Sequence, residues 1–225
     1  MTVSGFPADE FQGRITRLQS AMTERDLSAL LLTSAADFFY VTGFLTRFWE
    51  SPARPWFLVV PCDRLPIAVI PSIGEPLMAR TGLADIRTWE APDPRDDGIG
   101  LLAATLAECT APSARIGVPG GLETHLRMPL FDYERLCAGL APRTFADATD
   151  CVQRVREIKS EREIERIRAA CAVADRAFAR IPEIARPGDP LGEVFRAFQV
   201  CLLQEGADWV AYLAGGAGPD GYTDV

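Results

Sequence analysis

The chain has 225 residues, of which 48% are hydrophobic and 24% charged, and its formal net charge is −8. This length fits one large or two smaller domains, and the apolar content suffices for a buried core. The negative charge repels phosphate backbones and anionic lipid headgroups, and no apolar run approaches the ~20 residues that span a bilayer. We therefore expect no nucleic-acid partner and no membrane partner.

The first third of the chain combines a predicted helix with short buried strands. Apolar residues at three- and four-residue steps predict a helix over 9–26, with Asp9 as its cap. The continuous apolar run at 28–33 predicts a strand buried on both faces. The aromatic segment 35–44 reads as a connection that turns at Gly43.

Strands and helices continue to alternate up to residue 149, which indicates an α/β architecture with helices covering a sheet. Apolar runs bounded by proline predict two of the strands. The expected strands are 55–62, 66–71, 86–90, 114–120 and 144–149, and the expected helices are 72–82, 98–109 and 130–140.

The sequence becomes strongly helical from about Val155 onward. Ser160 and Glu163 form a capping box at the start of a helix that runs to 181. Its charged face, Glu161 to Arg168, is expected to be solvated or to form a salt-bridged seam between domains. A second helix is expected over 186–206, capped by Asp189 and ended by Gly206, with a strand at 207–216. We therefore predict two domains, 1–152 and 153–225.

The cysteines and the single histidine offer little catalytic chemistry. None of the six cysteines forms a C-x-x-C pair, so buried, reduced thiols are expected. The start of the chain, MTVSGFPADEF, lacks the basic and apolar regions of a secretory signal, and we expect a cytoplasmic protein. His125 is expected at the surface or at a helix entry. A metal site that needs several imidazoles cannot be built from this chain alone.

A glycine pattern near the end of the chain, Gly216, Gly218 and Gly221, has the G-x-G-x-x-G spacing of a dinucleotide-binding loop. Such a loop must lead into a helix, yet only four residues follow Gly221. Pro219 also removes one of the amide N–H groups that would hold phosphate. We therefore interpret the segment as a structural turn or as the edge of a pocket.

Three stretches of the chain are considered together: RDLSALLLTSAADFFYVTGF, RPWFLVVP and the junction DATDCVQRVREIKSEREIERIRAACAVADRAF, which ARPGDPLGEV continues. In this order they resemble the creatinase, prolidase and aminopeptidase P family of "pita-bread" metallohydrolases. The resemblance implies a creatinase-type amino-terminal α/β domain, followed by the first part of a pita-bread α+β catalytic domain. It also implies that the substrates are short peptides with proline after the scissile bond, as for an Xaa-Pro dipeptidase, and that the protein is a homodimer.

The same resemblance implies a divalent metal pair (Mn, Co or Zn) held by two Asp, one His and two Glu. In this family those ligands lie further along the catalytic domain than Val225. The spacing of Asp220 and Asp224 does not match the family's aspartates, and no histidine follows the glycines. We therefore expect the chain to be truncated within the catalytic domain, to bind no metal and to be inactive alone, so we assign it no catalytic residue and no metal ligand.

The loop FLTRFWESPARPW combines aromatic rings with arginines, which suits recognition of a substrate carboxylate. In creatinase-like dimers the corresponding segment reaches toward the neighbouring active site. The resemblance therefore implies that Phe48, Trp49 and Arg54 contact a substrate bound by the partner subunit. The alternative is that these side chains serve only core or interface packing.

Two other functions remain open. One is creatinase-type C–N hydrolysis of a small guanidino or amidino compound without catalytic metals. The other is a non-catalytic dimerisation or binding module that kept the amino-terminal domain. A complete set of metal ligands downstream would favour the peptidase over both.

Overall fold

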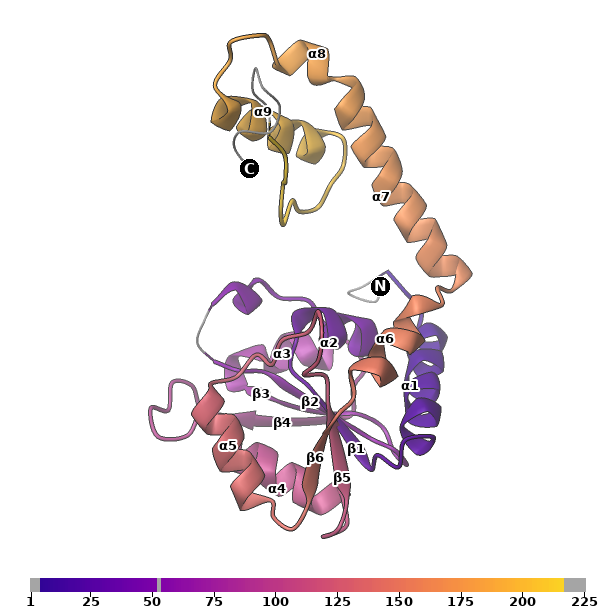
Figure 1. Cartoon of the computed structure of the whole chain (residues 1–225), viewed down its shortest axis with the longest axis vertical. Helices are drawn as coiled ribbons and strands as arrows, with labels where there is room; N and C mark the ends of the chain where they lie inside the picture. Colours follow the sequence, from indigo (N-terminus) through magenta and orange to yellow (C-terminus); the bar gives the residue numbers. More distant parts are fainter. Residues whose placement is uncertain (1–4, 52–53, 217–225) are drawn as a thin grey trace. The chain divides into compact units, whose positions relative to one another are not determined.

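The computed structural model describes residues 5–51 and 54–216. The chain forms two compact units, Met1–Ile158 and Lys159–Val225, which we describe separately. The first unit is a mixed α/β structure, as the sequence predicts. Its six strands and their covering helices are labelled in Figure 1.

A six-stranded sheet with the order β4-β3-β2-β1-β5-β6 forms the centre of the first unit. Strand β2 pairs antiparallel with both β1 and β3, whereas β1–β5, β5–β6 and β3–β4 are parallel pairs. The strands correspond closely to the predicted ones. They are β1 (Ala29–Leu32), β2 (Phe57–Pro61), β3 (Ile67–Pro71), β4 (Asp85–Trp89), β5 (Arg115–Val118) and β6 (Thr144–Asp147).

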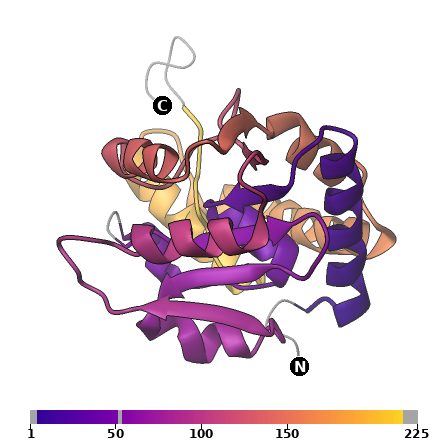
Figure 2. The ribbon, with the colours of Figure 1, turned by 90° about the horizontal axis from the view of Figure 1, so that it is seen from below.

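Helices cover both faces of this sheet. One face is covered by α1 (Ala8–Thr23), α2 (Ala35–Thr42), α3 (Glu75–Ala79) and α6 (Thr149–Glu157). The other face is covered by α4 (Ile99–Cys109) and α5 (Leu130–Gly139), the side from which Figure 2 is drawn. Two short 3-10 helices, η1 (Arg47–Glu50) and η2 (Ser72–Gly74), complete the unit.

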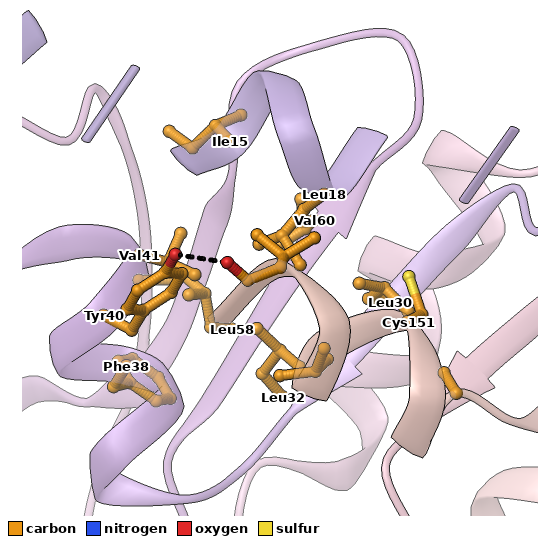
Figure 3. Close-up of a cluster of buried hydrophobic side chains, with 14 of the residues drawn as sticks. Ile15, Leu18, Leu30, Leu32, Phe38, Tyr40, Val41, Leu58, Val60 and Cys151 are labelled. Carbon is orange, nitrogen blue, oxygen red and sulfur yellow. Dashed lines mark hydrogen bonds between the residues drawn. The ribbon is translucent and has the colours of Figure 1, made fainter. Parts of the chain in front are cut away.

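Alternating side chains of the central strands form two separate cores. Leu30 and Leu32 of β1 pack with α1, α2 and α6, whereas Ala29 and Leu31 pack on the opposite face with α4. The first of these cores is drawn in Figure 3, where the Tyr40 hydroxyl donates to the Val155 carbonyl oxygen (3.2 Å). This bond fixes α6 against α2 inside the buried cluster.

The second unit consists of helices in the part of it that the structure describes. Helix α7 (Glu161–Ala179) begins at the predicted capping box, because the Ser160 side chain accepts from the Glu163 N–H and the Glu163 side chain accepts from the Ser160 N–H. Two further helices follow, α8 (Ile181–Ile184) and α9 (Leu191–Gln204). Within the described residues no helix is long and apolar enough to cross a membrane.

Five local predictions are wrong. Cys171 of α7, expected to be buried, is exposed. The segment expected as an aromatic connection is helix α2, and the strand expected at 207–216 is neither helix nor strand. A strand requires a hydrogen-bonded neighbour, and the described part of the second unit contains none. Asp9 lies inside the first turn of α1 instead of capping it, and Asp189 accepts from the Arg186 N–H while Pro190 occupies the N-cap of α9.

Alkaline pH should destabilise the first unit partly through Tyr133 of α5. Burial, followed by the nearby Cys137, raises the pKa of Tyr133 to about 12, above the ordinary value of about 10. The neutral phenol therefore stabilises the fold below pH ~10, and this contribution is lost between pH ~10 and ~12. We expect the melting temperature of Tyr133→Phe to fall less over this pH range than that of the wild type. Tyr212→Phe, which changes an exposed ring, is the control and should behave as the wild type does.

Candidate functional site

The candidate site is built around the segment that connects α2 to β2, of which residues 45–51 and 54–56 are described; we call these residues the recognition loop. Its first end is fixed by the turn after α2, where Gly43 adopts a left-handed backbone (φ 73°) and its N–H donates to the Phe39 carbonyl oxygen (2.9 Å). Phe44 follows and is fully buried, with its ring 5.2 Å from that of Trp56 at the other end of the loop. Both ends of the loop are therefore anchored in the core.

Trp49, one of the three predicted substrate contacts, is packed into the first unit. Its ring lies 5.1 Å from Phe38 and 5.6 Å from Trp56, and it contacts the buried cluster under η1. Part of this ring still lines a cavity of about 480 Å³. Trp49 therefore contributes to the core of the unit, whatever else it contacts.

Phe48 and Arg54 are placed differently from Trp49. The Phe48 side chain is 41% exposed, so a large apolar surface faces solvent. Arg54 has a left-handed backbone (φ 65°), which side-chain-bearing residues seldom adopt, and lines a second cavity of about 400 Å³. The structure thus leaves Phe48 and Arg54 available to a ligand, and their role as substrate contacts stays a prediction.

The two cavities lie beside the carboxyl ends of the parallel strands β1, β5 and β6. The larger one is lined by the start of α2, by Trp49, by Pro119, by residues 123–125 and by α6. The smaller one includes Arg54, Asp97 and Met128. His125 and Arg127 line both. The predicted surface position of His125 is confirmed, and the structure adds that this residue borders both cavities.

Charged groups in the larger cavity are mostly paired. Asp37 is nearly buried, accepts a hydrogen bond from the Ser34 hydroxyl (2.7 Å) and forms an ion pair with Arg156 (3.0 Å). In the smaller cavity, burial raises the pKa of Asp97, the carboxylates of Asp132 and Asp93 raise it further, and Arg54 opposes them. Guanidinium groups beside partly apolar cavities are suited to binding a carboxylate.

The metal pair implied by the family resemblance does not fit the part of the chain that the structure describes. Among residues 5–51 and 54–216, no group of three or more His, Cys, Asp or Glu side chains is placed to hold a metal ion. Asp220, Asp224 and two of the three patterned glycines lie outside the described residues. We therefore derive no chemical step through a metal on this chain.

The site residues predicted from the sequence do not include Asp37, Arg127 or Arg156. A signal for Asp37 was present, because Ser34 and Asp37 form the S-x-x-D spacing that caps α2. Nothing in the sequence indicates the partners of Arg127 and Arg156, which lie 73 to 119 residues away along the chain.

The fold is a mixed α/β domain in which helices cover both faces of a six-stranded sheet. Residues 14–158 match the Creatinase/Prolidase N-terminal domain family. The chain belongs to this family, as the three motifs of the sequence predict.

Among curated proteins, the chain is similar to the probable dipeptidase PepE of Mycobacterium tuberculosis strain H37Rv. The two are 29% identical over 218 residues, which are 96% of this chain and 54% of PepE. The hydrolase/peptidase y4tM of Sinorhizobium fredii is 29% identical over 194 residues, 84% of this chain and 48% of that protein. The chain thus spans about half the length of the curated relatives it matches.

Solved structures with a similar fold include prolidases and dipeptidases. Recombinant prolidase from Thermococcus sibiricus has a TM-score of 0.77 at 20% identity. The matched region covers 90% of this chain and 52% of the prolidase chain. Dipeptidase PepE from Mycobacterium ulcerans has a TM-score of 0.69 at 24% identity, covering 92% and 53%. At these identities the likeness shows the fold alone, and it confirms the predicted fold class.

Proposed function

We propose that this chain is the amino-terminal portion of an Xaa-Pro dipeptidase-like metallohydrolase, which cleaves short peptides before proline. The observation that carries the proposal is the extent of similarity to PepE, which covers 96% of the chain and so continues beyond the family domain that ends at residue 158. A domain shared with unrelated proteins would give a match confined to the first unit. The similarity in both units favours a dipeptidase over a binding module.

Within this proposal the two parts of the chain have different tasks. Residues 1–152 form the amino-terminal domain and residues 153–225 the beginning of the catalytic domain, although α6 packs with the first unit. The protein acts as a cytoplasmic homodimer, and the recognition loop presents Phe48, Trp49 and Arg54 to a peptide held by the partner subunit. The exposed ring of Phe48 and the cavity beside Arg54 support this role of the recognition loop.

The metal pair of the proposed enzyme, Mn, Co or Zn, belongs to polypeptide that this chain does not contain. Support comes from the described residues, which place no cluster of three metal-binding side chains together. Ligands would then come from the half of the relatives that this chain does not span.

The proposal is tested by comparing the chain alone with a chimera. In the chimera, Val225 is followed by the part of Mycobacterium tuberculosis PepE that the chain does not cover. We expect the chain alone, supplied with Mn²⁺, Co²⁺ or Zn²⁺, to bind no stoichiometric metal and to leave an Xaa-Pro dipeptide intact. The chimera should bind metal and hydrolyse the dipeptide, with intact PepE as the positive control.

Two results would contradict the proposal. If the chain alone binds stoichiometric metal and hydrolyses the dipeptide, the metal ligands lie within this chain and the proposal is wrong. A folded, metal-loaded chimera that does not hydrolyse Xaa-Pro dipeptides, beside an active PepE control, would show that this amino-terminal half does not serve such an enzyme.

A further inference from the structure

Arg127 holds the recognition loop at three points. Its guanidinium group donates hydrogen bonds to backbone carbonyl oxygens of Arg54 (3.4 Å), Trp49 (3.2 Å) and Ser51. The same group lies over the Trp49 ring, with its central carbon 5.1 Å from the ring centroid. One side chain therefore contacts the loop on both sides of its middle, by hydrogen bonds and by a cation–π interaction.

The backbone of Arg127 is itself attached to the sheet. Its N–H donates to the hydroxyl of Thr33 (2.9 Å), which directly follows β1 and is only 4% exposed. Thr33 and Arg127 are 94 residues apart along the chain. This bond gives the guanidinium group a fixed base, so the loop is held against the carboxyl end of a central strand.

The charge of Arg127 is used for the loop and not for an ion pair. Among the side chains that the structure describes, no carboxylate forms a salt bridge with it, and partial burial lowers its pKa. A half-buried guanidinium group loses hydration, and here backbone carbonyls replace it. Desolvating the guanidinium group costs free energy that an apolar methionine or leucine at this position would not cost. This cost indicates that Arg127 serves to position the loop.

We infer that Arg127 is a positioning residue that fixes the recognition loop, setting Trp49 toward the larger cavity and Arg54 toward the smaller one. The consequence for substrate binding rests on the function proposed above. The placement of the loop does not depend on that function and can be measured separately. Arg127 touches neither substrate nor reacting atoms in this assignment, and acts only through the loop.

The test is limited trypsin digestion of the full 225-residue chain, read by mass spectrometry as cleavage after Arg47 relative to cleavage after Lys159. Both residues are exposed, and trypsin does not cut after Arg54 because proline follows it. We expect Arg127→Met to raise the relative cleavage after Arg47 about tenfold, because local opening of the loop loses its charged hydrogen bonds. Arg127→Lys should give a smaller rise, since an ammonium group cannot span three carbonyls.

Arg143→Met is the matched control. Arg143 also donates to backbone carbonyls, those of Ala107 (3.1 Å) and Thr110 (2.8 Å), but it lies away from the loop. It should lower the melting temperature without changing the cleavage after Arg47. Equal cleavage ratios in Arg127→Met and wild type would overturn the inference, as would an equal rise in Arg143→Met. If Arg127→Met does not fold, Arg127→Lys decides by the same ratio.

The effect on substrate is measured in the PepE chimera. We expect Arg127→Met to raise KM for an Xaa-Pro dipeptide about tenfold with kcat within about twofold, and Arg127→Lys to restore part of the loss. A chimera that is inactive with the natural loop would count against the proposed function and leave the digestion result standing. The opposite result is also informative. If Arg127→Met opens the loop in the digestion but leaves the KM of an active chimera unchanged, the link between loop position and substrate binding is overturned.

Discussion

Replacing Trp56 with alanine is expected to lower the free energy of unfolding of the first unit by about 3–5 kcal/mol. The Trp56 side chain is 1% exposed and lies against the rings of Phe44 and Trp49. The backbone of Gly74 also approaches Trp56 so closely that a Cβ there would lie 2.2 Å from the indole ring. Because these neighbours pack closely around the buried ring, truncation leaves a cavity that the surroundings cannot close.

Urea denaturation of Trp56→Ala, followed by circular dichroism, measures this loss. Phe131→Ala is the control, since that ring is 80% exposed, and it should change the free energy of unfolding by no more than about 0.5 kcal/mol. A loss below about 1 kcal/mol for Trp56→Ala would contradict the description of Trp56 as the core anchor at one end of the recognition loop.

Substitutions of two adjacent aromatic residues of the recognition loop, Trp49 and Phe48, should affect stability and substrate recognition to different degrees. Trp49→Ala is expected to cost about 2–3 kcal/mol of unfolding free energy, because the ring packs on Phe38 and Trp56 and supports the Arg127 guanidinium group. Phe48→Ala removes a ring that is already 41% exposed and should cost no more than about 0.5 kcal/mol.

In the PepE chimera the order of effects should be different. Phe48→Ala is expected to raise KM for an Xaa-Pro dipeptide about tenfold, the loss expected when one apolar contact with the substrate is removed. Because the fold stays intact, this loss would report recognition alone. A KM within twofold of the unsubstituted chimera would leave Phe48 as a surface residue and would remove it from the predicted substrate contacts.

Local patterns predict most elements of the first unit. The strands β1, β2 and β3 are apolar runs with proline or polar residues at their ends, and the capping box at Ser160 marks the start of α7 within one residue. Such signals depend on neighbours along the chain, so they can be read without the tertiary structure. Helix α2 was missed because its aromatic residues resemble a strand or a turn, although Ser34 and Asp37 carried the capping signal.

Pairings between distant segments could not be predicted in this way. The strand expected at 207–216 failed because strand formation needs a neighbouring strand, a condition outside the local pattern. The composition of the recognition loop indicated arginines and aromatic rings suited to binding, but not which of them would be buried. Trp49 and Phe48 are adjacent and chemically alike, and only packing separates the supporting ring from the exposed one.

The sequence by itself therefore determined the family, the α/β class of the first unit and the loop in which recognition is expected. Only the tertiary structure decided how that loop is held, because Thr33, Arg127 and the loop carbonyls meet through contacts that span 73 to 94 residues. Hydrogen bonds between such distant segments depend on the three-dimensional path of the backbone, which brings the end of β1 beside the segment before α5.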